Sequence, residues 1–348
     1  MEDEAQADAA AVVVDERLFS FLTDMKTSPR CFSMSALKPF FRSLIQRPVV
    51  LALAVSAPLA ARTAEHGKAF ATPEEAVAAL AAATSRADTN ALRVIFGPAA
   101  EDLENPDRVQ AANELRAFTT ALEQTRRIVR ESDSRCVLEV GEMFWPFPVP
   151  IVTRNGQWFF DTEAGKEELL NRRIGGNELR ALQSVRGYVA AQREYAEEDR
   201  DGDEVLEYAQ KFGSTPGQKD GLYWPLDLDG EISPLGPLVA QAQAQGYGGS
   251  PRGEGAKPEP FHGYFFKILT AQGKSAPGGK YNYVTNGNMI GGFALAAWPA
   301  EYGVSGIMTF IVNQQGRVYQ KNLGSKTARI AAAMTEYNPD HTWTISRE

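Results

Sequence analysis

Residues 172–212 read RRIGGNELRALQSVRGYVAAQREYAEEDRDGDEVLEYAQKF, the longest amphipathic pattern in the chain. Apolar and aromatic side chains recur there at steps of three and four residues, the spacing of one helix face. The members of this stripe are Leu179, Leu182, Val185, Val189 and Gln192, and Tyr188 and Tyr195 lie beside them. Gly176 or Asn177 can begin the helix, and Glu178 then places a negative charge in the first turn, where it suits the helix dipole. We therefore expect a scaffold helix that lies on a sheet.

A run of alternating acids follows this helix. Asp199, Asp201 and Asp203 fit the first, third and fifth positions of a calcium loop, because a hard cation binds six to eight oxygens. The run departs from the EF-hand pattern, since Glu204 replaces the turn glycine and Gln210 stands where a bidentate glutamate belongs. The segment is either a calcium site, with calcium as the protein's one cofactor, or a solvated acidic turn that joins two helices.

Length and charge set the broad class of the protein. The chain has 348 residues, enough for two domains, and its hydrophobic content of 43% permits real cores. Its net charge of -8 argues against nucleic acid as a partner, because binding phosphates needs a basic surface.

The N-terminal region contains a targeting signal that begins at an internal methionine. Met34 opens a positively charged segment, which an apolar stretch at residues 48–61 and several small residues follow. The apolar stretch is too short to span a bilayer, so residues 34–64 are predicted to be a secretory signal peptide and residues 1–33 a non-native extension. The alternative is an N-terminal anchor helix. We expect cleavage, and no membrane association afterwards.

Two α+β units are predicted after the signal. In residues 70–170, helical patterns precede three short segments with a period of two, and Asn155-Gly156 is a strong hairpin signal between the last two. This order is similar to NTF2-like modules, in which helices precede a curved antiparallel sheet. The helices are expected near residues 73–84, 89–96 and 107–129, and the strands at residues 136–140, 149–153 and 157–161.

The second predicted unit, residues 171–348, begins with the long helix. Four segments that alternate in hydrophobicity follow, with turn signals such as Asn286-Gly287 between them. A long helix followed by an antiparallel meander is again an α+β arrangement. The strands are expected at residues 263–270, 291–298, 306–312 and 316–322.

Few residues have the spacing of a catalytic site. The chain contains no GxSxG elbow, and its three histidines lack the spacing of a zinc site. Glu142, beside the aromatic segment WPFP, and Asp161, at a strand end, are the candidates for paired-carboxylate hydrolysis. The alternative is that both are exposed acids at strand ends.

Four aromatic residues lie in or beside a stretch rich in glycine and proline. Tyr223, Trp224, Tyr247 and Tyr264 would line a groove for a sugar or a peptide, or else form the core of a loop-rich domain. Cys136 would be the one cysteine left after signal cleavage, and its place in the strand pattern CVLEV predicts a buried thiol.

Several long motifs indicate a family. The segments EMFWPFPVPIV, YVAAQREYAEEDRDGD and EYAQKFGSTPGQKDGLYWP resemble the bacterial family known as domain of unknown function 2950, and the resemblance runs from residue 70 to residue 343. It implies an exported protein of Gram-negative bacteria, periplasmic or secreted, without an assigned activity. Members of that family favour Asp-Gly-Asp-Gly in the acidic run, whereas Glu204 replaces the last glycine here.

A second resemblance concerns the C-terminal half. NELRALQSVRGYVAAQREYA, GYFFKIL and GGFALAAWPAEYGVSGIMTFIVNQQGRVYQ look like the globular head of type IV pilins and pseudopilins, in which a helix lies on a meander of strands. The hydrophobic pilin stalk is absent from the sequence, so the resemblance implies a pilin-like head used outside a filament.

Together these patterns favour a non-enzymatic exported protein that binds an envelope protein or a small ligand. The alternative is an envelope hydrolase that uses paired carboxylates, Glu142 or Asp161, in a cleft between the two units.

Overall fold

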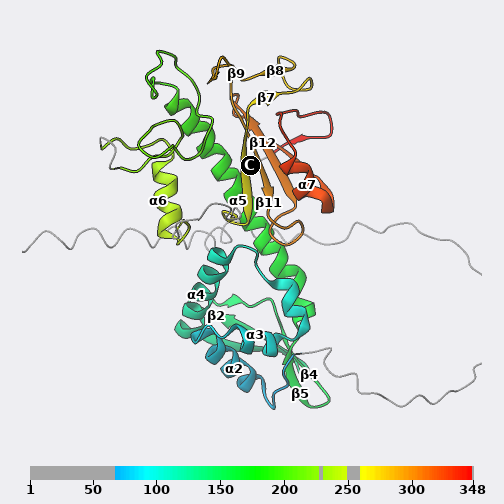
Figure 1. Ribbon diagram of the computed structural model, residues 1–348. Helices are drawn as coiled ribbons and strands as arrows, with labels where there is room; N and C mark the ends of the chain where they lie inside the picture. Colours follow the sequence, from blue (N-terminus) through cyan, green and yellow to red (C-terminus); the bar gives the residue numbers. More distant parts are fainter. Residues whose placement is uncertain (1–66, 227–229, 249–258, 347–348) are drawn as a thin grey trace, which may run out of the picture. The chain divides into compact units, whose positions relative to one another are not determined.

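The computed structural model describes residues 67–226, 230–248 and 259–346, which form two five-stranded antiparallel sheets with helices packed against them (Figure 1). This architecture confirms the predicted α+β class. The predicted signal peptide and the extension before it lie outside the described residues. Among the residues that are described, no helix combines the length and the apolar character needed to cross a membrane.

The first helices begin at residues that the sequence marks as caps. Thr72 caps the first of them, because its hydroxyl accepts the Glu75 N–H at 3.2 Å while the Glu75 carboxylate accepts the Ala71 N–H at 3.1 Å. Asp88 and Asp107 cap the next two α-helices in the same way. The helices are α2 (Pro73–Ser85), α3 (Thr89–Phe96), the 3₁₀ helix η2 (Pro98–Leu103) and α4 (Arg108–Gln124).

The first sheet follows these helices and shares a core with them. Its order is β1-β2-β4-β5, and β3 pairs with β2. The predicted hairpin at Asn155-Gly156 is confirmed, and both residues have the positive φ angles, 53° and 77°, that this turn requires. Cys136 is fully buried in this core. The strands are β1 (Arg126–Ser132), β2 (Arg135–Val140), β3 (Trp145–Pro146), β4 (Ile151–Arg154) and β5 (Gln157–Phe160).

Strand β1 corrects one sequence prediction. The helix expected to reach residue 129 ends at Gln124, and the chain continues directly into β1. Thr125, Ile128 and Val129 are β-branched, and such side chains fit a pleated sheet better than a helix. Pairing with β2 therefore decides this segment in favour of a strand.

The long helix α5 (Thr162–Tyr195) begins much earlier than the sequence predicts. Asp161 is its N-cap, and the Asp161 carboxylate accepts the Ala164 N–H at 3.3 Å. Gly175 and Gly176 lie inside the helix and do not start it, because strong helix formers precede them and Glu168 pairs with Arg172 one turn later at 2.6 Å. The prediction of a start at Gly176 or Asn177 was wrong for this reason.

The C-terminal half of α5 packs on the second sheet. The order of this sheet is β14-β13-β12-β11-β6. All six residues of β11 are buried, since both α5 and α7 contact this strand (Figure 1). Leu179, predicted to belong to the apolar stripe, is instead 59% exposed. The strands are β6 (Tyr264–Leu269), β11 (Ala294–Pro299), β12 (Met308–Asn313), β13 (Tyr319–Asn322) and β14 (Thr344–Ile345).

Shorter elements connect these layers. Two small antiparallel pairs, β7 with β8 and β9 with β10, lie between β6 and β11 in the sequence. The remaining elements are α6 (Gly236–Ala244), β7 (Ala271–Gln272), β8 (Tyr281–Asn282), β9 (Val284–Thr285), β10 (Asn288–Met289), the 3₁₀ helix η3 (Gly324–Lys326) and α7 (Thr327–Ala332).

Gln192 joins the last turn of α5 to the segment that follows it. Its amide is fully buried, donates to the Ala209 carbonyl at 2.7 Å and accepts the Ala209 N–H at 2.8 Å. The same amide nitrogen lies 2.9 Å from the Tyr188 hydroxyl. One side chain thus satisfies both backbone groups of a buried residue, as a strand partner would.

We expect Gln192→Leu to lower the free energy of unfolding by about 2–4 kcal/mol, because it leaves the Ala209 N–H and C=O buried without partners. Chemical denaturation measures this loss. Gln183→Leu is the matched control, since Gln183 is exposed on the same helix and its replacement should change stability by less than about 0.5 kcal/mol. Equal losses in the two variants would contradict the role of Gln192.

Candidate metal centre

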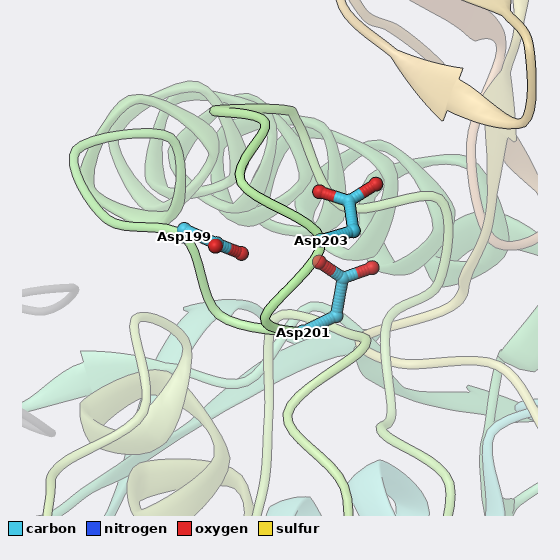
Figure 2. Close-up of side chains that lie close together, drawn as sticks. All are labelled: Asp199, Asp201 and Asp203. Carbon is cyan, nitrogen blue, oxygen red and sulfur yellow. The ribbon is translucent and has the colours of Figure 1, made fainter.

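The acidic loop, residues 199–207, brings three carboxylates together just after α5 ends. One oxygen from each of Asp199, Asp201 and Asp203 lies within 4.8 Å of the others, and all three residues are exposed. Figure 2 shows the Asp201 and Asp203 carboxylates side by side, with Asp199 pointing toward them. The alternate spacing seen in the sequence therefore places all three acids in one cluster.

Arg200 anchors this loop to the protein core on the side away from the three carboxylates. Its side chain is only 6% exposed and lies over the rings of Trp224, at 5.3 Å, and Tyr195, at 5.7 Å. The guanidinium pairs with Glu231 and donates to the Tyr195 carbonyl at 3.2 Å. Because the residue between the first two acids is anchored in the core, the carboxylates on either side of it face solvent.

Backbone N–H groups fix Asp199 in place. Its two carboxylate oxygens accept the N–H groups of Gly202 and Glu204, each at 2.8 Å. The bond from Glu204, and then that from Gly202, holds the pKa of Asp199 below its usual range. Asp199 thus stays ionised to lower pH than an ordinary aspartate, as a cation ligand should.

Glu204 has a backbone conformation that favours glycine. Its φ angle is 68°, and Gly202 two residues earlier has 81°. Glu204 is the sixth residue counted from Asp199, the position at which a calcium loop makes its sharp turn with glycine. The loop therefore makes the sharp turn of a calcium loop, which the replacement of glycine by Glu204 had placed in doubt.

Glu207 is an acid close enough to the cluster to feel its charge, and sequence reasoning missed it. It is the ninth residue counted from Asp199, a position that often reaches a calcium ion through water. Burial raises the pKa of Glu207, and the charges of Asp201 and Asp203 add to the effect. Although Asp201 is exposed, the partial desolvation of its carboxylate raises its pKa, and the charge of Asp203 is the next cause, so these carboxylates repel one another.

The hairpin of β9 and β10 supports the loop. Asn288 donates to Asp203 at 2.5 Å, and the Met289 N–H donates to Glu207 at 2.7 Å. Gln210, the twelfth residue of the pattern, donates to the Gly287 carbonyl at 2.6 Å. The twelfth side chain is therefore bound to the hairpin, and the ligands for a cation would come from the three clustered aspartates.

The three clustered aspartates suit a hard cation. Every candidate ligand is a carboxylate oxygen, the kind that calcium and magnesium prefer. The loop lacks the bidentate glutamate of an EF-hand, so water would complete the coordination shell of a bound ion.

We expect Glu204→Gly to raise the free energy of unfolding by about 1 kcal/mol, because glycine adopts a positive φ without the steric cost that a side chain incurs. Thermal unfolding in a chelator measures the gain. Glu204→Ala removes the same charge but keeps Cβ, so it should give no comparable gain. A similar increase in both variants would assign the effect to charge repulsion.

The structure gives the two predicted hydrolase acids other roles. Asp161 caps α5 and lies 3.6 Å from Arg154. Glu142 is exposed in the turn between β2 and β3. Neither residue lines the cavity of about 410 Å³ that lies beside η2 and α5. The lining residues of this cavity are Glu101, Asp102, Glu104, Lys166, Leu170, Glu301 and Val304.

Three of the four predicted ligand-binding aromatics belong to the core. Trp224, Tyr247 and Tyr264 are each less than 10% exposed, and Tyr223 is partly buried. The Tyr264 hydroxyl donates to the Met308 carbonyl at 2.9 Å, and the Trp224 indole donates to the Glu231 carbonyl at 3.2 Å. Because their polar atoms have partners inside the protein, these side chains pack as core residues and do not form an exposed groove.

A family model described as "Protein of unknown function (DUF2950)" matches residues 67–345. The chain belongs to this family. The match confirms the family resemblance, and both sheets and the acidic loop of this DUF2950 protein lie within it. A search of curated proteins finds no match, and a search of solved structures finds none either. The likenesses to NTF2-like modules and to pilin heads therefore stay predictions.

Proposed function

We propose that this DUF2950 protein is an exported, non-enzymatic binding protein of the cell envelope whose acidic loop holds a structural calcium ion. The observation that carries the calcium site is the cluster of Asp199, Asp201 and Asp203, with Glu207 beside it. The geometry offers oxygen ligands at the spacing of a calcium loop, on a backbone that already makes the turn.

Electrostatics explains what the ion would do. The three clustered aspartates carry a combined formal charge of about -3 and repel one another, and the raised pKa values of Asp201 and of the nearby Glu207 reflect desolvation together with this repulsion. A bound divalent cation would offset the repulsion. It would also tie the end of α5 to the β9–β10 hairpin, since Asp203 and Glu207 each accept a hydrogen bond from that hairpin.

Export agrees with such a site. The sequence at residues 34–61 has the charged, apolar and small-residue parts of a signal peptide. Outside the cytoplasm of a Gram-negative bacterium, in the periplasm or beyond it, millimolar calcium can fill a loop of modest affinity. A location outside the cytoplasm and a calcium site of modest affinity are thus consistent with each other.

A binding role fits the acids better than hydrolysis does. Asp161 serves as a helix cap, and Glu142 lies in an exposed turn. We further propose that the C-terminal part, in which α5 packs on β11 and β12, works as a pilin-like head that presents a surface to an envelope protein or a small ligand.

We expect 10 mM calcium to raise the Tm of the purified protein by about 5–10 °C relative to EGTA, if the ion is about a hundredfold above its Kd. Asp201→Asn and Glu207→Gln should reduce this increase, because each removes a negative charge. Differential scanning calorimetry measures all three proteins.

Asp133→Asn is the matched control, since Asp133 is an exposed acid in the turn between β1 and β2. It should show the same calcium-dependent increase as the wild type. Equal melting temperatures of the wild type in calcium and in EGTA would contradict the calcium site, whatever the variants show.

Export has its own test in a Gram-negative host. We expect the full gene to yield a protein in the periplasm or the medium whose mass corresponds to cleavage near residue 61, and Leu53→Arg to keep it in the cytoplasm because a charge interrupts the apolar stretch. Leu18→Arg is the control, since a start at Met34 would omit that residue. Cytoplasmic wild-type protein would refute export.

A further inference from the structure

A cavity of about 410 Å³ lies among η2, the first half of α5 and the loop that joins β11 to β12. Its lining combines exposed acids on η2 and on the loop with two half-buried apolar side chains, Leu170 and Val304. Small-molecule sites in proteins are concave, measure about 300–1,000 Å³, and mix apolar surface with a few placed polar groups. The cavity therefore has the size and the lining of a ligand site.

Buried hydrogen bonds fix the loop that forms one wall. Ser305 is fully buried, and its hydroxyl accepts the Glu301 N–H at 3.0 Å. The Ser305 carbonyl accepts the Asn177 amide in the middle of α5 at 2.9 Å. The backbone that carries Glu301 is thus attached to α5.

The same helix holds η2, which forms the other wall. Lys166 pairs with Asp102 at 2.5 Å, and Arg173 donates to the Glu104 carbonyl at 3.3 Å. The Glu104 carboxylate accepts the Arg93 Nε–H at 3.1 Å. Because α5 has contacts with both walls, the cavity is preformed and needs no ligand to assemble it.

The two remaining acids of the cavity have no such partners. Glu101 and Glu301 are exposed, and neither forms an ion pair within the part of the chain that the structure describes. Two neighbouring cations, Arg93 and Arg173, interact more strongly with other acids. The cavity thus carries a surplus of negative charge, which attracts cations.

The acids of the cavity surround it and do not converge on one point. Among the described residues, three acids with oxygens within 4.8 Å of one another occur at Asp199, Asp201 and Asp203, and not in the cavity. A bare metal ion needs such convergence, because calcium binds six to eight oxygens at once. Separate carboxylates that share a cavity with apolar surface suit a longer molecule with more than one positive charge.

We propose that this cavity binds a linear aliphatic diamine or polyamine, with one ammonium group at Glu101, another at Glu301, and the methylene chain against Leu170 and Val304. Aliphatic ammonium groups are charged at neutral pH, and each offers three N–H donors to carboxylates. Such a ligand would be the small molecule of the envelope binding protein proposed above, on whose function this assignment rests.

Isothermal titration calorimetry of the purified protein tests the class of ligand. The titrants are α,ω-diamines with three to eight carbons, at low ionic strength because salt screens exposed charges. We expect one site per protein, at which the best diamine binds about tenfold more tightly than the monoamine of the same chain length. Tenfold is the effect of about one charged hydrogen bond.

Variants locate the site. Glu101→Gln and Glu301→Gln should each weaken binding of that diamine about tenfold, and both should melt at the wild-type temperature because the replaced side chains are exposed. Asp201→Asn is the matched control, since it removes the same charge from the acidic loop. It should bind the diamine as the wild type does.

Three outcomes overturn the proposal: no saturable binding of any diamine to the wild type, a monoamine that binds as tightly as the diamine, or an equal loss of affinity in Asp201→Asn. The last would place the amine at the acidic loop. The calcium site is judged separately by the calcium-dependent Tm, so a protein that binds the diamine but does not respond to calcium would contradict the calcium site alone.

Discussion

Helix α5 must remain continuous for 34 residues, and the rest of the described fold depends on that continuity. Its first turns begin at the Asp161 cap, directly after the last strand of the first sheet, and Leu169 packs against the first core. Its last turns, from Ala181 to Tyr195, belong to the second core. Two glycines in the middle weaken the helix intrinsically, so packing at both ends maintains it.

Buried polar side chains hold α5 where apolar packing alone would leave backbone groups unsatisfied. Asn177 bonds to α4 and to the loop before β12, and Gln192 satisfies the backbone of Ala209. Such bonds contribute little net energy when made but are costly to lose, so they select one arrangement of helix and sheet over others. The acidic loop inherits its position from this arrangement, because it starts four residues after the helix ends.

The sequence is informative where the signal is local. The Asn155-Gly156 hairpin, the capping box at Thr72 and the cluster of Asp199, Asp201 and Asp203 all depend on residues a few positions apart, and the structure has each of them. The sequence is misleading where a residue far away in the chain determines the local secondary structure. Pairing with β2 makes a strand of the residues after Gln124, and helix formers on both sides carry α5 through Gly175.

The same distinction applies to the candidate site. Glu207 could have been found by counting nine residues from Asp199, but its bond to Met289 depends on a hairpin about eighty residues away in the chain. The burial of Trp224, Tyr247 and Tyr264 was one of two alternatives that the sequence left open, because composition alone cannot separate a core aromatic from an exposed one. The contacts of these residues in the folded structure, and not their residue types, determine whether they belong to the site or to the core.

The place of Cys136 has a practical consequence. Its thiol is fully buried on β2, and burial raises its pKa, so little reactive thiolate is available to reagents in solution. The only other cysteine, Cys31, precedes the predicted signal peptide. In a protein produced without residues 1–64, a single cysteine introduced on the surface would therefore be the one site that a maleimide dye or a spin label modifies, without prior removal of the native thiol.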